Sequence, residues 1–272
     1  MAAKQNMLST ALPWDAVATG YEQVTMKLFQ GYSDQALAMS GLDRNADIVD
    51  IACGPGTLAI RAAQLVNSVN AVDFSPAMID LLAQKKQQLN IDNLDFYCGD
   101  GQALRYEDTQ FDAAFSMFGL MFFPDRVLGM REMHRVLREG GKALISSWAP
   151  VADSPAMETT FGTLRAMNPG IPAPKFDVES LENPEVIRAE LSQAGFKDIE
   201  TKRVSQSFNA NSIDEYLADL VTGTAPIVML KRNMTLEQWQ QCLIVAREHL
   251  VQTLGEGPIS LSADAWLALA TK

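Results

Sequence analysis

Two glycines and an acid lie together where an apolar stretch gives way to a helical one. The stretch DIACGPGTLAI, residues 50–60, opens with Asp50 and contains Gly54 and Gly56. Glycine lacks a Cβ, so it permits a sharp turn and lets a ligand approach the backbone closely. The helix that follows presents free N–H groups and the positive end of its dipole to that ligand. The stretch therefore predicts a ligand cradle, with a tight structural turn as the alternative.

Two further acids end the next two strand-like stretches. Asp73 follows Gly54 by about 20 positions, where a carboxylate can accept hydrogen bonds from both hydroxyls of a ribose. Asp100, in CGDGQAL, can accept from the exocyclic amine of an adenine, while Gly101 lets the backbone come near. The alternatives are a turn aspartate at Asp73 and an ordinary Asp-Gly turn at Asp100. Together with the cradle, these acids predict a nucleoside site.

The rhythm of the chain supplies a scaffold that brings these strand ends together. Strand-like stretches alternate with helical ones, which favours parallel strands joined by right-handed crossovers, with helices on both faces. Ser75 and Pro76 are typical of a helix start, and Gly140 with Gly141 of a helix end. The expected strands are 47–52, 68–73, 94–98, 111–117 and 142–148, and the expected helices 58–66, 75–89 and 125–139.

The flanking segments depart from this rhythm. Residues 7–40 have the spacing of short helices, and residues 150–184 are rich in proline and loop-like. Later we expect a helix over 184–195, a strand over 198–208, two helices opened by capping boxes (Ser212 with Glu215, Thr235 with Gln238) and a closing strand over 264–272. We divide the chain into a helical lid (1–40), a binding core (41–150) and the remaining strands with substrate-pocket insertions (151–272), as one compact domain overall.

Composition narrows the range of partners. The chain has 272 residues, a net charge of −11 and no basic run, which disfavours nucleic acid and membrane surfaces and favours a small-molecule substrate. No membrane-spanning run or secretory signal is visible, so we expect a cytoplasmic protein. Cys53, Cys98 and Cys242, with His134 and His249 as the two imidazoles, lack metal-ligand spacing. We therefore expect no metal and three reduced, buried thiols.

A series of five motifs runs through the core. They are VDIACGPGTLAIRAA, VNAVDFSPAMID, FYCGDGQAL, FDAAFSMFGLMFFPD and HRVLREGGKALISSW. Over about residues 48–148 the series resembles the class I S-adenosylmethionine-dependent methyltransferases, in the branch of the ubiquinone/menaquinone C-methyltransferases. The resemblance implies S-adenosylmethionine as cofactor and an α/β, Rossmann-like, doubly wound seven-stranded sheet with a reversed last strand, a helical lid and a late helical insertion. Ala52 replaces a glycine usual in this branch, but alanine is small enough that we expect cofactor binding to survive.

The resemblance also implies residue roles at both ends of the cofactor. Asp73 would hold the ribose, Phe74 and Met78 would pack on the adenine, and Asp100 with Gly101 would read its amine. At the methionine end, the implied contacts come from Asp50, from the loop Cys53–Gly56 and from Ser116. The Asp50 carboxylate suits an ammonium group and opposes the pyrophosphate of NAD(H).

The reaction chamber is expected to be aromatic. Ser116 and Phe118 would line the path to the methyl group, and the lid carries Trp14 and Tyr21, of which Tyr21 is a candidate for the active-site lining. We interpret Trp14, Phe122, Phe123 and Trp148 mainly as packing residues. Methyl transfer needs an in-line nucleophile and exclusion of water, and neither histidine has the position of a general base.

Three functions fit the sequence. The first is transfer of a methyl group to oxygen, nitrogen or carbon of a small acceptor. The alternative is a lyase or cyclase in which the amino or carboxylate group of S-adenosylmethionine attacks its own aminobutyl chain and releases methylthioadenosine, with azetidine-2-carboxylate or a lactone as product. A non-catalytic S-adenosylmethionine-binding protein is the third. An apolar stripe around Trp239 fits either packing on its own sheet or a homodimer.

Overall fold

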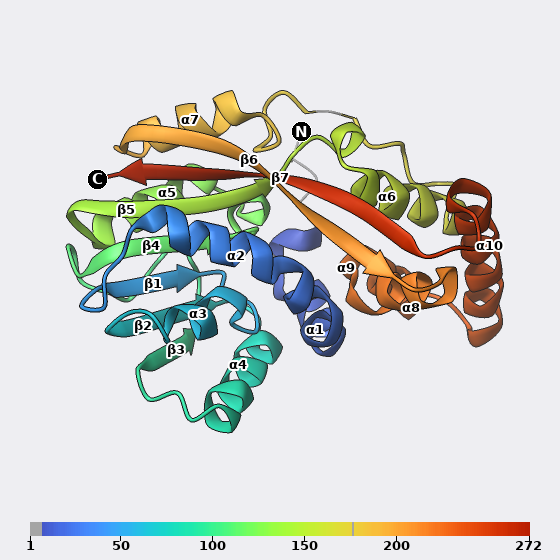
Figure 1. Cartoon of the computed structure of the whole chain (residues 1–272), viewed down its shortest axis with the longest axis horizontal. Helices are drawn as coiled ribbons and strands as arrows, with labels where there is room; N and C mark the ends of the chain where they lie inside the picture. Colours follow the sequence, from blue (N-terminus) through green and yellow to red (C-terminus); the bar gives the residue numbers. More distant parts are fainter. Residues whose placement is uncertain (1–6, 176) are drawn as a thin grey trace.

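Seven strands form one mixed sheet, in the order β3-β2-β1-β4-β5-β7-β6 (Figure 1). The computed structural model describes residues 7–175 and 177–272. The strands are β1 (Asp47–Ile51), β2 (Ser68–Asp73), β3 (Leu94–Cys98), β4 (Phe111–Met117), β5 (Leu137–Trp148), β6 (Lys197–Ala210) and β7 (Ile259–Thr271). β7 runs antiparallel to β5 and β6, whereas the pairs among β1 to β5 are parallel. The predicted sheet with a reversed last strand is confirmed.

Helices cover both faces of this sheet. They are α2 (Met26–Ser40), α3 (Thr57–Ala62), α4 (Pro76–Gln88), α5 (Arg126–Val136), α6 (Pro155–Met167), α7 (Pro184–Gln193), α8 (Ile213–Gly223), α9 (Ala225–Arg232) and α10 (Leu236–Leu254). Apolar residues of α2, α3 and α4 form one core with the sheet, and those of α5 and α7 form another. β6 and β7 continue past the other strands toward α6, α8 and α10, where a third apolar cluster lies (Figure 1).

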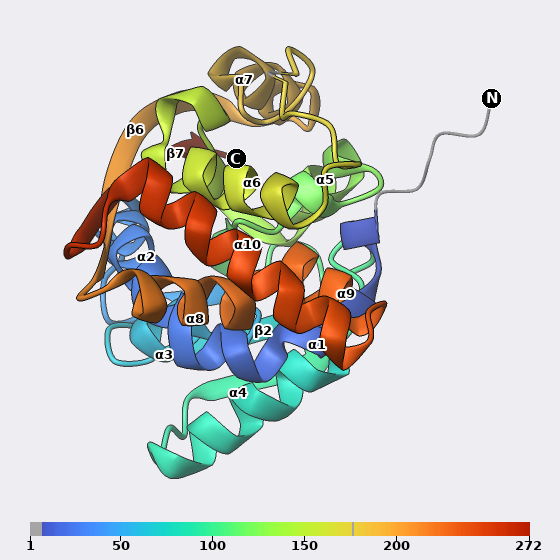
Figure 2. The same cartoon turned by 90° about the vertical axis from the view of Figure 1, so that its right-hand side faces the viewer.

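The segment expected to form a lid is helical. It contains α1 (Ala11–Gly20), a π-helical turn (Tyr21–Thr25) and α2; residues 1–6 of the predicted lid lie outside the described residues. Helix α1 packs against α4 and α9 (Figure 2). Val17 and Ala18 of α1 are buried there with Met78 of α4 and Ala225 of α9. The N-terminal helix therefore joins the strand ends of the core to the late insertion.

Most local predictions agree with the structure, and the disagreements have physical reasons. Strands 68–73, 94–98 and 111–117 have the predicted bounds, and the Ser75 hydroxyl caps α4 by accepting from the N–H of Met78. The helix predicted over 125–139 instead ends at Val136. Leu137 is already extended and buried, and Arg138 bonds to carboxylates of the sheet, so β5 starts before the two glycines.

The prediction for the later segments was less accurate. Helix α6 lies within the supposed loop 150–184, and α9 adds a third helix where two were expected. The capping box at Thr235 is complete. At Ser212 it is not, because the carboxylate of Glu215 accepts from the N–H of Asn211 instead. Helix α3 ends early, at Ala62, and β7 begins earlier than predicted, at Ile259.

The apolar stripe of α10 faces the inside of the protein. Trp239, Ala246 and Leu250 are buried in a cluster with residues of α6 and α8. The stripe thus packs on its own chain, as the first of the two expected alternatives has it.

The cysteines differ from the expectation of three buried thiols. Cys53 is buried, Cys242 is half-buried and Cys98 is exposed, and all three are free. Among the described residues, no helix is long and apolar enough to cross a membrane.

Candidate active site

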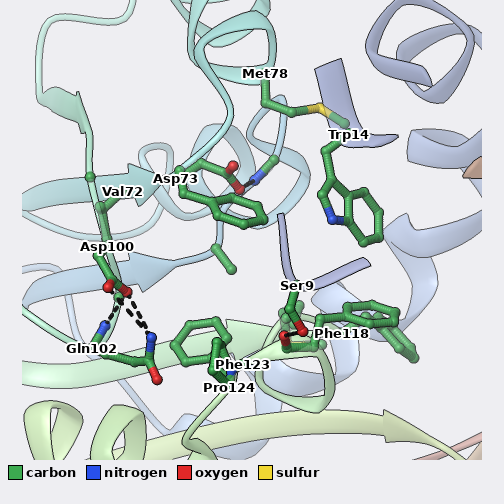
Figure 3. Close-up of a pocket in the computed structure, with 18 of the residues that line it drawn as sticks. Ser9, Trp14, Val72, Asp73, Met78, Asp100, Gln102, Phe118, Phe123 and Pro124 are labelled. Carbon is green, nitrogen blue, oxygen red and sulfur yellow. Dashed lines mark hydrogen bonds between the residues drawn. The ribbon is translucent and has the colours of Figure 1, made fainter. Parts of the chain in front are cut away.

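A cavity of about 240 Å³ lies at the carboxyl ends of the strands. Its walls come from the β1–α3 turn, the ends of β2, β3 and β4, and the lid segment. Asp100 and Gln102 lie on one side and Trp14 on the opposite side, with Asp73 and Met78 between them (Figure 3). The lining residues are Ser9, Trp14, Tyr21, Ala52, Gly54, Val72, Asp73, Phe74, Met78, Gly99, Asp100, Gly101, Gln102, Met117, Phe118, Gly119, Phe122, Phe123 and Pro124.

The structure brings eight of the predicted site residues to this one cavity, namely Tyr21, Gly54, Asp73, Phe74, Met78, Asp100, Gly101 and Phe118. Four others are not part of its lining. Cys53 and Ser116 are buried next to lining residues in the chain, Asp50 is buried two positions before the lining residue Ala52, and Gly56 is the N-cap of helix α3. The four therefore form a supporting layer around the lining.

The predicted glycine turn takes the left-handed backbone that glycine tolerates. The φ angles of Gly54 and Gly56 are 54° and 88°. Ala52, at the start of the turn, also has a positive φ of 57°, which costs an alanine about 1–2 kcal/mol relative to glycine. A Cβ on Gly119 would meet the Cβ of Ala52 at 2.4 Å. The close approach of these two loops is thus possible only because position 119 is glycine.

Asp73 holds this turn from the neighbouring strand. Its Oδ2 accepts a hydrogen bond of 2.8 Å from the N–H of Gly54, and its Oδ1 accepts one of 2.9 Å from the N–H of Ser75. Burial raises the pKa of Asp73 to about 6, and the nearby Asp15 carboxylate contributes to the increase, while the two N–H donors oppose it. The carboxylate is therefore fixed in orientation and lies at the cavity wall.

Asp50 is buried with one oxygen unsatisfied. Its Oδ2 accepts from the N–H of Ala59 at 3.1 Å, but its Oδ1 has no hydrogen-bond partner among the described residues. Burial raises the pKa of Asp50 to about 8, and the charge of Asp73 adds to the effect. An unpaired buried carboxylate oxygen is costly, and a cationic ligand group would offset that cost.

Phe118 is held in a strained conformation where the chain leaves β4. Its φ is 57°, and its N–H donates a buried hydrogen bond of 2.8 Å to Oγ of Ser146. Its ring packs against those of Phe29 and Trp148, at centroid distances of 4.8 and 4.4 Å, and these two rings also contact each other. The nearby hydroxyl of Ser116 is buried without a partner among the described residues. Strain of this kind, kept by the surrounding structure, is often found at functional sites.

At the opposite end, Asp100 lies in a short polar chain. Its Oδ1 accepts from the N–H of Gln102 at 2.8 Å, and the side-chain oxygen of Gln102 accepts from the N–H of Asp125 at 2.9 Å. A Cβ on Gly101 would lie 2.6 Å from the ring of Phe123, so glycine is needed there for packing. Asp100 is exposed and faces the cavity with its remaining lone pairs.

Sequence reasoning missed part of the lining. Ser9, Gln102 and Pro124 were not proposed, and Trp14, Phe122 and Phe123 were interpreted mainly as packing residues although they line the cavity. The aromatic run FGLMFFPD after β4 contained the signal for Phe122 and Phe123. Ser9 gave none, because its position depends on a long-range hydrogen bond of 2.6 Å from its hydroxyl to the carbonyl of Phe122.

The cavity is acidic and aromatic. None of the described lining residues is lysine, arginine or histidine. His134 packs on the ring of Phe196, at a centroid distance of 5.1 Å, and His249 lies in a separate groove beside α6. Burial and the charge of Asp73 raise the pKa of Tyr21 above its ordinary value, so the Tyr21 hydroxyl stays protonated. A cavity of this kind suits a ligand that carries positive charge and a flat ring.

Comparison with known proteins agrees with this geometry. Residues 48–141 match the family described as a methyltransferase domain. A demethylmenaquinone methyltransferase of Oceanobacillus iheyensis is 35% identical over 99 residues, which are 35% of this chain and 42% of that protein. The 27-O-demethylrifamycin SV methyltransferase of Amycolatopsis mediterranei is 27% identical over 195 residues, which are 71% of this chain and 68% of that protein.

A solved structure shows the same fold. The YcgJ protein of Bacillus subtilis superimposes with a TM-score of 0.59 at 18% identity, over 88% of this chain and 97% of that one. The chain spans about half the length of most of the curated relatives it matches. The resemblance to the class I S-adenosylmethionine-dependent methyltransferases is confirmed, and it is strongest over the methyltransferase domain at residues 48–141.

Proposed function

We propose that the protein is an S-adenosylmethionine-dependent methyltransferase that acts on a small, ring-containing acceptor. The observation that carries the proposal is the single cavity that joins an adenosyl-type end, with Asp73 and Asp100, to an aromatic end at Trp14 and Phe118. The family match over residues 48–141 and the named methyltransferases among the relatives support it.

The residues present fit this cofactor. Asp73 offers a fixed carboxylate for the ribose hydroxyls, and Asp100 has free lone pairs for an adenine amine. The unsatisfied Oδ1 of Asp50 marks the end of the cradle at which an ammonium group gains most. When bound, S-adenosylmethionine supplies an activated methyl group on a sulfonium.

The protein contributes position and a dry environment rather than a base. Trp14, Tyr21 and Phe118 line the cavity. When S-adenosylmethionine is bound, these aromatic rings would attract its cationic sulfur and would exclude water. Among the described lining residues, Asp73, Asp100 and Tyr21 are the ionisable groups, and the first two are assigned to the nucleoside. The acceptor must therefore bring a nucleophile that reacts without a strong protein base, such as an acidic ring hydroxyl or an electron-rich ring carbon.

The lining also limits the charge of the acceptor. Without a lysine, arginine or histidine in the described lining, an anionic carboxylate or phosphate would find no counter-charge. A neutral, flat, largely apolar ring suits the aromatic wall. Relatives whose names give demethylmenaquinone and demethylrifamycin as substrates agree with this class. The net charge of −11 argues in the same way against nucleic acid as the acceptor.

Product analysis tests the proposal. The protein is incubated with S-adenosylmethionine, first alone and then with a panel of quinols, phenols and amines, and the nucleoside products are identified by mass. The proposal expects S-adenosylhomocysteine only when an acceptor is present, with quinols and acidic phenols preferred. Methylthioadenosine formed without an acceptor would contradict it and would indicate a lyase or cyclase.

A further inference from the structure

Helix α1 is attached to the start of helix α4 through one carboxylate. Oδ1 of Asp15 accepts a hydrogen bond of 2.6 Å from the hydroxyl of Ser75 and one of 3.2 Å from the N–H of Ala77. Ser75 is the cap of α4, and its own N–H donates to Asp73. Ser75 is thus the one residue that connects Asp15 on the lid to Asp73 at the cavity wall, through a hydrogen bond to each.

The helix that Asp15 attaches carries part of the cavity wall. Trp14 precedes Asp15 in α1 and lines the cavity, and Tyr21 lines it from the turn that follows α1. The contact of α1 with α4 also includes the apolar cluster of Val17 and Ala18 with Met78. Beyond the end of α1, Glu22 of the π-helical turn forms an ion pair of 2.8 Å with Lys85, further along α4. An ion pair near the surface contributes little, whereas a carboxylate that accepts from a helix N-terminus is favoured by charge-assisted bonding and by the helix dipole.

We propose that Asp15 is a positioning residue of the cofactor site, which latches helix α1 onto the N-terminus of α4 and must release it before the cofactor can be exchanged. The inference rests on the proposed function, since the cavity must hold S-adenosylmethionine or its product. Asp15 is not one of the described residues that line the cavity. It acts through Ser75, which is bonded to both Asp15 and Asp73.

Besides attaching α1, Asp15 affects the pKa of Asp73 through its charge. The groups that face Asp73 are Asp15 from α1, Asp50 from β1, Tyr21 from the lid, and Cys53 and Cys98 from the strand ends. Asp15 is the acid whose charge contributes to the raised pKa of Asp73. Neutralising Asp15 should therefore lower the pKa of Asp73 while leaving the other groups in place.

Two variants separate geometry from charge. Asp15→Asn keeps an oxygen that accepts from Ser75 and Ala77 but removes the charge, whereas Asp15→Ala removes both. Asp34→Asn is the matched control, because Asp34 lies on α2 in an exposed pair with Arg61, away from the cavity. Thermal unfolding followed by circular dichroism shows whether each variant is folded.

The first measurement is the dissociation rate of S-adenosylhomocysteine, followed by displacement in a stopped-flow instrument. We expect Asp15→Ala to dissociate at least tenfold faster than the wild type, Asp15→Asn to be intermediate, and Asp34→Asn to match the wild type. If Asp15→Ala is folded and its dissociation rate lies within twofold of the wild-type rate, the proposal that Asp15 holds α1 on α4 is wrong. Should Asp15→Ala fail to fold, Asp15→Asn takes over the test, and a wild-type rate there would overturn it.

The second measurement is the pH dependence of S-adenosylhomocysteine affinity between pH 4 and 8. In Asp15→Asn, the loss of affinity on acidification should move to lower pH, an effect that a purely structural role would not produce. An unmoved profile would contradict the charge effect.

A third readout needs no cofactor. In the apo protein, Asp15→Ala should be cut by a protease within residues 7–20 several times faster than the wild type, and an unchanged cleavage rate would count against the latch. If the wild type fails to bind S-adenosylhomocysteine while this cleavage difference appears, the proposed function fails and the attachment of α1 by Asp15 stands.

Discussion

The N–H of Gly54 donates a hydrogen bond of 2.8 Å to Oδ2 of Asp73. The glycine turn after β1 and the acid at the end of β2 are therefore one unit, although 19 positions separate them in the chain. A ligand that displaces or reorients Asp73 also moves the backbone of the turn. For this reason we expect substitutions at either position to affect the same binding step.

Gly119 and Ala52 provide a test of the close approach of two loops. Because a Cβ at position 119 would lie 2.4 Å from that of Ala52, Gly119→Ala should lower the free energy of unfolding by about 1–3 kcal/mol. Ala52→Gly should change it by less than about 1 kcal/mol, since relief of the positive φ is offset by the greater freedom of glycine in the unfolded chain. Urea unfolding measures both values.

The double variant, with Ala52→Gly and Gly119→Ala together, completes a double-mutant cycle with the two single variants. Removing the Ala52 methyl group makes room for a methyl group at position 119, so Ala52→Gly should recover at least about 1 kcal/mol of the loss caused by Gly119→Ala. The second contact of that methyl group, at 3.0 Å from Oγ of Ser116, remains, so recovery should be incomplete. Strictly additive effects would show that the two loops do not limit each other.

We expect the hydrogen bond from the N–H of Phe118 to Oγ of Ser146 to keep Phe118 in its strained conformation. Ser146→Ala leaves the buried N–H of Phe118 unpaired, which should cost about 1–3 kcal/mol of stability and weaken binding of S-adenosylhomocysteine as well. Ser147→Ala is the matched control: Ser147 is the next residue of β5 and is also buried, and its place in the strand points its side chain to the opposite face of the sheet from Ser146. Equal losses in the two variants would contradict the role of Ser146.

The raised pKa of Asp50 predicts how the stability of the apo protein depends on pH. Its pKa in the folded protein, about 8, is above the ordinary carboxyl value of 3.8, so folding favours the protonated form. Its contribution to stability is complete below about pH 4 and is lost as the pH rises through about 8. Asp50→Asn should therefore flatten the loss of stability in that window, which thermal unfolding at several pH values measures.

Cofactor binding should lower the pKa of Asp50, which burial raises in the apo protein. A cationic group beside Oδ1 favours the ionised carboxylate, so binding S-adenosylmethionine near pH 7 should release a proton from Asp50. Calorimetry in two buffers with different ionisation enthalpies detects the proton, and Asp50→Asn should abolish its release. A wild-type titration without proton release would mean that the ammonium group lies elsewhere.

Local signals in the sequence were sufficient for the central fold. The Ser75-Pro76 start of α4 and the apolar strands 68–73, 94–98 and 111–117 were predicted at their observed bounds, because each depends on neighbours in the chain. Helix α6 was missed although Ser154-Pro155 repeats the same starting pattern, because the prolines around it were interpreted as a loop. The end of α5 was misplaced because Arg138 leaves the helix for distant carboxylates.

The cavity was predictable only in part, for a related reason. Asp73, Asp100 and the glycine turn lie at strand ends, so their meeting follows from a parallel sheet. Ser9 reaches the cavity through a bond to Phe122, 113 positions away, and no local pattern encodes such a contact. The latch at Asp15 is of the same kind, since its partners on α4 are at least 60 positions away.

Calorimetric titration with S-adenosylhomocysteine, the demethylated form of the cofactor, tests the central claim most directly. We expect saturable binding at one site in the wild type and at least a tenfold loss of affinity in Asp73→Ala, with Asp34→Asn unchanged as the matched control. The absence of binding in the wild type, or full affinity in Asp73→Ala, would contradict the assignment of this cavity to an adenosyl cofactor.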